Sequence, residues 1–222
     1  MIDDLFSRLD SEDQRREILA DGAMLLHGCA HAQAPALLAA VDEIAAVAPF
    51  RRMQTPGALR MSVAMSNCGA LGWVSDRQGY RYSPLDPDNG RQWPAMPEVF
   101  CQLAQMAAAA AGFPDFLPDA CLINRYEPGS KLSLHQDKDE PDREAPIVSV
   151  SLGLPAVFLF GGLKRKEPTT RVLLAHGDVV VWGGPARLRY HGVQTLKHGL
   201  FPETGNSRIN LTFRKAGPPG RQ

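Results

Sequence analysis

The stretch that decides the fold runs from residue 120 to residue 182 and reads ACLINRYEPGSKLSLHQDKDEPDREAPIVSVSLGLPAVFLFGGLKRKEPTTRVLLAHGDVVVW. Short runs rich in β-branched and aromatic residues are separated in it by turn sequences such as EPGS, GLP and GGLKRKEP. We expect strands at 120–126, 131–137, 146–153, 156–160, 170–175 and 178–182, followed by LRYHGV at 188–193 and SRINLTF at 207–213. Short strands with this punctuation predict a jelly-roll or small barrel rather than a parallel α/β sheet.

Upstream of this stretch the chain is predicted to be helical and irregular. Residues 36–48 and 97–111 read as amphipathic helices, bounded by proline and glycine, that cover one face of the barrel. Residues 50–95 contain only short strand-like pieces, such as MSVAM at 61–65, and so long a connection is usually functional. The expected class is therefore mainly β with flanking helices, in a single domain over residues 1–222.

Overall composition is that of an ordinary globular protein, with 44% apolar and 22% charged residues and zero formal net charge. The N-terminus MIDDLFSRLDSEDQRRE is acidic and polar, unlike a signal peptide, and no run of apolar residues is long enough to span a membrane. The four cysteines are scattered, which indicates reduced thiols. We expect a cytoplasmic protein.

Charge is unevenly distributed along the chain. Between residues 51 and 95 six arginines and three aspartates are interleaved with Trp73, Tyr80, Tyr82 and Trp93. From residue 186 onward the chain contains seven Lys/Arg residues and one acidic residue. Cations mixed with aromatics suit a phosphate backbone and stackable bases. Taken by itself, the pattern is explained more simply by a solvated face and core aromatics.

A metal site is indicated by His135-Gln136-Asp137 at the end of a predicted strand. Side chains two residues apart point to the same face of a strand, so His135 and Asp137 can bind one metal, with His191 as the third ligand from another strand. Two histidines and one carboxylate are the ligand set of non-haem Fe(II) oxygenases. A His-x-Asp triplet is weak evidence, and a catalytic zinc site is the competing interpretation, although the common His-Glu-x-x-His motif is absent.

The last predicted strand alternates strictly between polar and apolar residues. Arg208, Asn210, Thr212 and Arg214 fall on one face, which would be costly inside a barrel without a polar ligand. Two guanidinium groups on that face suit a dicarboxylate. The alternative is that this face is exposed on an edge strand.

With these motifs in place, the chain resembles the AlkB family of Fe(II)/2-oxoglutarate dioxygenases, which repair DNA. The resemblance rests on His135-x-Asp137, His191 and Arg208-x-Asn210-x-x-x-Arg214, and on the longer stretches MSVAMSNCGALGW (61–73), QGYRYSPLDP (78–87), 118–142, 146–165 and 176–192. It extends from about residue 49 to residue 216 and includes no departure at the metal or co-substrate positions.

The resemblance implies a double-stranded β-helix (jelly-roll) catalytic core over 118–216 and an N-terminal nucleotide-recognition lid over 50–95. It implies Fe(II) on His135, Asp137 and His191, with 2-oxoglutarate and O2 as co-substrates. It places 2-oxoglutarate against Asn124, Tyr126, Arg208, Asn210 and Arg214. It assigns the modified base to Trp73, Tyr80, Tyr82, Met65, Asp139 and Arg165.

The activity implied is oxidative demethylation of N-alkylated bases such as 1-methyladenine and 3-methylcytosine, with release of formaldehyde, succinate and CO2. Such a methyl group is unreachable inside a duplex, so the expected partner is alkylated DNA, single-stranded or with a flipped base, and RNA stays open. We expect no membrane partner and a monomer. Arg51, Arg52, Arg60, Arg77, Lys164 and Arg165 are candidates for phosphate contact. The alternatives are a 2-oxoglutarate hydroxylase acting on a protein or small molecule, and a metal-free jelly-roll that binds nucleic acid.

Overall fold

The computed structural model describes residues 15–217, so the acidic segment up to residue 14 and Arg221 lie outside the described residues. Its strands are β1 (Arg16–Ala20), β2 (Ala23–Leu26), β3 (Ala64–Gly69), β4 (Gly72–Asp76), β5 (Gly79–Ser83), β6 (Ala120–Tyr126), β7 (Leu132–His135), β8 (Ile147–Gly153), β9 (Ala156–Phe160), β10 (Thr170–Leu174), β11 (Val179–Trp182), β12 (His191–Val193) and β13 (Arg208–Arg214). Its helices are α2 (Ala34–Val47), α3 (Glu98–Ala110) and the 3-10 turn η1 (Gly184–Ala186).

Two antiparallel sheets form the body of the protein. The larger has seven strands in the order β1-β2-β11-β8-β13-β6-β3, and the smaller has four in the order β10-β9-β12-β7. From β6 to β13 the chain therefore supplies four strands to each sheet, β6, β8, β11 and β13 to the larger and β7, β9, β10 and β12 to the smaller. This is the double-stranded β-helix expected from the sequence.

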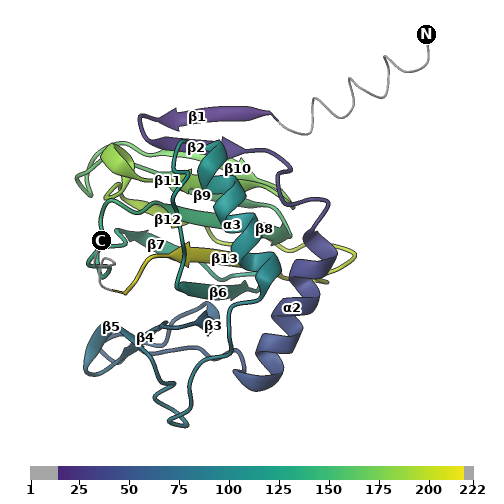
Figure 1. Cartoon of the computed structure of the whole chain (residues 1–222), viewed down its shortest axis with the longest axis vertical. Coiled ribbons are helices and arrows are strands. Elements are labelled where there is room, and N and C mark those ends of the chain that lie inside the picture. Colours follow the sequence, from purple (N-terminus) through teal and green to yellow (C-terminus); the bar gives the residue numbers. More distant parts are fainter. Residues whose placement is uncertain (1–14, 218–222) are drawn as a thin grey trace.

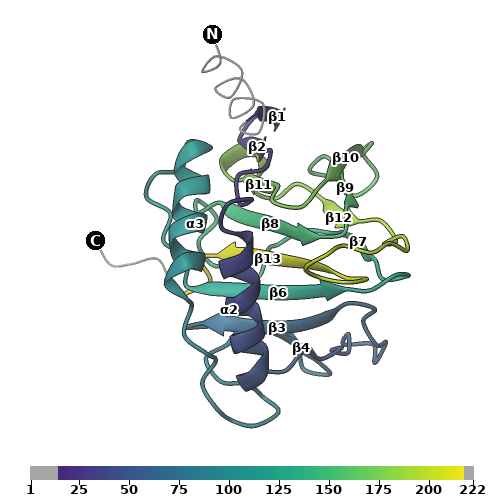
Figure 2. The ribbon, with the colours of Figure 1, turned by 90° about the vertical axis from the view of Figure 1, so that its right-hand side faces the viewer.

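Both helices pack on the same face of the larger sheet, opposite the smaller sheet (Figures 1 and 2). Each helix buries an apolar stripe at helical spacing, including Leu37, Val41 and Ile44 on α2 and Phe100 and Leu103 on α3. The sequence prediction that two helices cover one face of the barrel is confirmed.

Alternation along the central strands divides the core in two. On β13, Ile209, Leu211 and Phe213 face the helices, and β8 adds Val148 and Val150 to the same apolar layer. The intervening residues face the space between the two sheets. Because both faces of these strands are buried, the polar face of β13 looks into the protein interior.

The structure corrects three details of the sequence prediction. The N-terminal part is not only helical and irregular, because β1 and β2 extend the larger sheet beyond β11. β2 has only four residues and its outer neighbour β1 is largely exposed, so neither strand shows a clear periodic pattern in the sequence. β2 forms because it pairs with the edge of β11. The strand expected at 188–193 begins only at His191, after the η1 turn, and the strand expected near 61–65 begins at Ala64.

Residues 50–95 divide between two sheets. β3 pairs with β6 and forms one edge of the larger sheet, whereas β4 and β5 form a separate two-stranded hairpin. The hairpin projects beside β3 at one end of the molecule (Figure 1). Among residues 15–217, no helix has the length and apolarity needed to cross a membrane.

Candidate metal centre and active site

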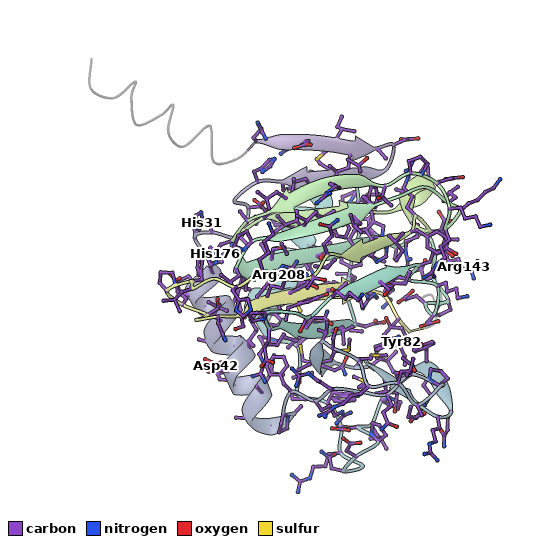
Figure 3. All side chains as sticks on the ribbon, turned by 180° about the vertical axis from the view of Figure 1, so that it is seen from behind. His31, Asp42, Tyr82, Arg143, His176 and Arg208 are labelled. Atoms are coloured by element: carbon purple, nitrogen blue, oxygen red, sulfur yellow. The ribbon has the colours of Figure 1, made fainter. Side chains whose placement is uncertain are left out.

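A cavity of about 740 Å³ opens between the two sheets. Its walls come from strands of both sheets, from the β4–β5 hairpin and from the loop at 55–63. Figure 3 shows Arg208 near the centre of the molecule and Tyr82 on the hairpin. The cavity extends from Arg208 to Trp73 and Tyr80, and so joins the centre of the barrel to the hairpin.

His135, Asp137 and His191 meet in this cavity. One ligand atom from each lies within 4.8 Å of the others. His191 is the direct cross-strand partner of His135, and their ring centroids are 4.3 Å apart. Gly192 allows this approach, since a Cβ atom there would lie 2.6 Å from the Leu132 carbonyl oxygen.

Backbone carbonyl groups orient both imidazole rings. The Nδ1 atom of His135 lies 2.9 Å from the Ser133 oxygen, and that of His191 lies 3.0 Å from the Arg189 oxygen. With Nδ1 donating to a carbonyl, the Nε2 lone pairs face Asp137, at 3.5 and 3.8 Å from its carboxylate. This is the tautomer required of a histidine that binds metal through Nε2.

Asp137 reaches the centre in a way that differs from the prediction. β7 ends at His135, so Asp137 lies in the following loop rather than on the strand. Two arginines hold it there: Arg214 donates from Nε and Nη2 to Oδ2 at 2.9 and 2.7 Å, and Arg187 donates to the backbone oxygen of Asp137 at 2.6 Å. Contacts with residues distant in sequence, rather than the geometry of a strand, therefore hold Asp137 in place.

The protonation states in the cluster suit a cation. Burial lowers the pKa of His191 to about 3, with the nearby His135 acting in the same direction. Burial opposes ionisation of Asp137, but the Arg214 charge and the two histidines hold the pKa of its carboxyl well below the usual value. Burial is the largest single influence on His135 and acts to lower its pKa, but the hydrogen bond and charge of Asp137 and the contact with the Ser133 oxygen together outweigh it and raise that pKa. A carboxylate with a neutral imidazole beside it is ready to bind a divalent metal.

The polar face of β13 lines the same cavity. Arg208, Asn210, Thr212 and Arg214 all contribute to its wall and are buried. β13 lies between β8 and β6 and pairs with both, so the edge-strand alternative is wrong. Ser149 and Ser151 of β8 accept hydrogen bonds from Asn210 and Arg208 respectively, an arrangement that the sequence analysis did not anticipate.

Several buried donors on this face have no hydrogen-bond partner within the described chain. They are Nε and Nη1 of Arg208 and Nη1 of Arg214, together with the acceptor Oδ1 of Asn124. Unpaired buried guanidinium nitrogens are costly, and a carboxylate is the group that relieves the cost. The donor set thus fits a dicarboxylate beside the metal ligands. Tyr126 is the cross-strand partner of Arg208 on the same face of the sheet, with the Arg208 guanidinium 5.1 Å from its ring centre, but it does not line the cavity.

The residues assigned to the base lie mainly at the hairpin end of the cavity. Trp73 of β4 and Tyr80 of β5 stack with centroids 5.6 Å apart, and the Trp73 indole N–H donates to Asp139 at 3.1 Å. Met65 and Arg165 also line the cavity. Tyr82 does not: its hydroxyl donates instead to Glu140 at 2.6 Å.

Glu140 and Arg187 contact the metal-ligand cluster, and the sequence did not predict their place there. Both are buried, and Arg187 Nη2 donates to Glu140 at 3.0 Å. Glu140 belongs to QDKDEPDRE, which reads as solvated loop, and nothing in such a charged run distinguishes Glu140, which is buried, from the exposed acids beside it.

The candidate phosphate-binding cations separate into two groups. Arg51 pairs with Asp86 and Asp88, and Arg52 pairs with Glu127, so these two stabilise the fold locally. Arg60, Arg77, Lys164 and Arg165 are exposed and form no ion pair with any residue between 15 and 217. Arg187, Arg208 and Arg214 of the basic C-terminal part are buried rather than on a surface.

Residues 22–214 match the model of the 2OG-Fe(II) oxygenase superfamily. The chain is 62% identical over 214 residues to the alpha-ketoglutarate-dependent dioxygenase AlkB of Escherichia coli K12, covering 96% of this chain and 98% of that protein. It is 33% identical over 171 residues to the DNA N(6)-methyladenine demethylase ALKBH1C of Arabidopsis thaliana, covering 65% of this chain and 38% of that protein.

A solved structure from the same family is also similar to this chain. The structure of OsALKBH1 aligns with a TM-score of 0.79 at 30% identity, covering 90% of this chain and 100% of that one. Its fold therefore corresponds to nearly the whole of the described chain. With the His-Asp-His cluster and the buried arginines Arg208 and Arg214 in one cavity, these similarities show that the chain belongs to the AlkB family and is an Fe(II)- and 2-oxoglutarate-dependent dioxygenase.

Proposed function

We propose that this enzyme removes methyl groups from N-alkylated nucleic-acid bases of the 1-methyladenine and 3-methylcytosine type. One observation carries the proposal: the metal cluster and an aromatic pair, Trp73 and Tyr80, line a single cavity. A flat ring that stacks at the hairpin end would direct its substituent toward the metal. Direct reversal of the damage follows, with formaldehyde, succinate and CO2 as products.

In this proposal His135, Asp137 and His191 hold the iron, and the polar face of β13 holds 2-oxoglutarate. Arg208 and Arg214 present their unpaired nitrogens to its carboxylates, with Asn124 and Asn210 beside them and Tyr126 supporting Arg208. When bound, iron supplies the reaction of O2 with 2-oxoglutarate that oxidises the methyl carbon. The chain itself positions the reactants and keeps bulk water from the metal, since Asp137 and His191 are buried.

The base pocket suits a cationic ring. Trp73 offers a π face, and Asp139, which is exposed and already accepts from the Trp73 indole, would take an exocyclic amine and offset the ring charge. Met65 would contact the ring edge, and Arg165 the adjoining backbone. Unmodified bases lack the positive charge, so electrostatics contributes to selectivity.

The proposed partner is alkylated DNA, single-stranded or with the damaged base flipped out, with RNA as a second substrate to test. Arg60, Arg77 and Lys164 would contact the phosphates. ALKBH1C of Arabidopsis thaliana is by its name a DNA demethylase, which supports a nucleic-acid substrate. We include a monomeric state in the proposal. A cytoplasmic location is also part of the proposal.

Membership of the AlkB family favours base demethylation over a protein or small-molecule hydroxylase. A metal-free binding module is inconsistent with the family of dioxygenases to which the chain belongs.

The test is an oxygen-started assay after anaerobic loading with Fe(II) and 2-oxoglutarate. Formaldehyde and succinate are measured on oligonucleotides that carry 1-methyladenine, 3-methylcytosine or no methyl group. We expect formaldehyde in proportion to methylated base, and none from Asp137→Ala. Asp115→Ala, in an exposed turn, is the control and should match the unchanged enzyme. Formaldehyde from Asp137→Ala would refute the ligand assignment, and succinate without formaldehyde on every oligonucleotide would refute the substrate.

A further inference from the structure

Glu140 lies where four separate segments of the chain converge. Its carboxylate accepts from the Tyr82 hydroxyl at 2.6 Å and from Arg187 Nη2 at 3.0 Å, and it faces Arg214 Nε at 3.4 Å. The side chain is only 2% exposed. Tyr82 belongs to the β4–β5 hairpin, Arg187 follows η1, and Arg214 ends β13.

The two arginines that contact Glu140 are the same two that hold Asp137. Arg214 binds the Asp137 carboxylate, and Arg187 binds the Asp137 backbone oxygen. Arg187 also donates to the backbone oxygen of Ala145, which fixes the far end of the loop. Glu140 thus sets the positions of both arginines, and through them the position of a proposed iron ligand.

The charges in this cluster are balanced. Asp137 and Glu140 are buried acids, and Arg187 and Arg214 are buried bases, with side chains between 2% and 9% exposed. Removal of the Glu140 charge would leave two guanidinium groups facing one carboxylate. The excess positive charge would then oppose a divalent cation bound to Asp137.

The hairpin is tied to the same cluster at two points. Trp73 and Tyr82 are direct cross-strand partners on β4 and β5. Trp73 donates to Asp139, and Tyr82 donates to the adjacent Glu140. If the hairpin shifts when a base stacks on Trp73, these two hydrogen bonds would therefore move the loop that carries Asp137.

We infer that Glu140 is a positioning residue that couples the base-binding hairpin, through Tyr82, to the iron ligand Asp137, through Arg187 and Arg214. The inference rests on the proposed roles of Asp137 and Trp73. It predicts that metal binding and binding of methylated oligonucleotide influence each other, and that the influence is reciprocal.

The first experiment measures metal binding without nucleic acid. Mn(II) is titrated into the metal-free protein with 2-oxoglutarate, and free Mn(II) is followed by electron paramagnetic resonance. Glu140→Gln should weaken Mn(II) binding by roughly tenfold or more, because the arginine charge is no longer compensated. Glu127→Gln is the matched control: it also removes an acid paired with an arginine, but one that lies away from Asp137, and it should leave the affinity unchanged.

The second experiment measures the coupling. The same titration is repeated with an oligonucleotide that contains 3-methylcytosine, under conditions where Mn(II) supports no turnover. In the unchanged protein the oligonucleotide should shift the Mn(II) affinity by about fivefold or more. Tyr82→Phe removes one hydroxyl, so it should keep the affinity measured without oligonucleotide and lose most of that shift.

The outcomes separate this inference from the proposed function. Unchanged Mn(II) affinity in a folded Glu140→Gln protein, or an undiminished shift in Tyr82→Phe, would overturn the inference even if demethylation is active. A shift absent from the unchanged protein would also overturn it. If Glu140→Gln unfolds, as its thermal transition would reveal, Tyr82→Phe alone decides. If the proposed substrate is wrong, the unchanged enzyme will release no formaldehyde, whereas Glu140→Gln will still weaken Mn(II) binding.

Discussion

The Nη2 atom of Arg214 lies 2.7 Å from Oδ2 of Asp137, and its Nε atom lies 2.9 Å from the same oxygen. A residue that the sequence assigned to 2-oxoglutarate is thus bound to a residue that it assigned to iron. Only Nη1 of Arg214 is left without a partner among the described residues. Arg214 therefore belongs to both proposed sites, and its replacement should affect both.

Arg214→Lys keeps the charge but loses the two-pronged contact with Asp137. We expect weaker Mn(II) binding together with a higher KM for 2-oxoglutarate, each by roughly tenfold, since one ammonium group cannot replace the planar fork. The free energy of unfolding should fall by about 1–3 kcal/mol. Mn(II) titration, succinate formation and urea unfolding measure the three effects. Arg125→Lys, which alters an arginine packed on Phe50, is the control, and a change in the KM alone would contradict the dual role.

Trp73→Ala should weaken binding of a 3-methylcytosine oligonucleotide. Loss of base stacking costs about 1–3 kcal/mol, which corresponds to roughly 5- to 150-fold in Kd. Succinate formed without oligonucleotide should change by less than about twofold, because Trp73 lies at the hairpin end of the cavity and not at the metal. Fluorescence anisotropy gives the Kd. Trp73→Phe should retain most of the affinity, and equal losses in both assays would argue against a role in base binding.

Binding of single-stranded methylated oligonucleotide should depend modestly on salt. Three or four phosphate contacts predict a slope of log K against log salt of roughly −2 to −3. Arg60→Ala should reduce the magnitude of that slope by about 0.7, whereas Arg52→Ala should not, because Arg52 already pairs with Glu127. An affinity that barely changes between low and moderate salt would contradict phosphate contact by these cations.

His176 should make stability depend on pH. Its Nδ1 atom accepts a hydrogen bond from the Gly153 N–H at 3.0 Å, and burial, with His31 at 5.1 Å between ring centroids, lowers its pKa (Figure 3). The folded state therefore binds fewer protons at this group than the unfolded chain does. The stabilisation is complete above the unfolded pKa of about 6.5 and is lost as the pH falls through that value toward the folded one.

Urea unfolding between about pH 5 and 8 measures this effect, and His176→Gln should flatten the pH dependence. His198→Gln, which changes an exposed histidine, should retain it. Identical pH profiles for the unchanged protein and His176→Gln would contradict the assignment.

Much of the architecture could be predicted from local pattern. The turn sequences between residues 120 and 182 separate strands that the structure contains, and the strict alternation of 208–214 placed Ile209 and Arg208 on opposite faces of β13. The helices begin and end within two residues of their predicted bounds. These features depend on neighbours in sequence, which is why the sequence reveals them.

Other features had no local signal. β1 and β2 form because β11 offers a free edge, and Asp137 reaches the metal site although its strand has already ended. Glu140 is chemically indistinguishable from the acids around it until Tyr82, Arg187 and Arg214 enclose it. Each of these outcomes requires contacts between residues far apart in the chain.

The sequence by itself determined where most strands of the jelly-roll lie in the chain, which residue types could bind a metal, and which face of the last strand is polar. Periodicity and residue chemistry are properties of short segments, so they can be recognised from the sequence without a structure. Only the tertiary structure decided which ionisable groups are buried together. Charge pairing in a low-dielectric interior depends on distance in space, and Arg214 and Asp137 are 77 residues apart in sequence but share a hydrogen bond.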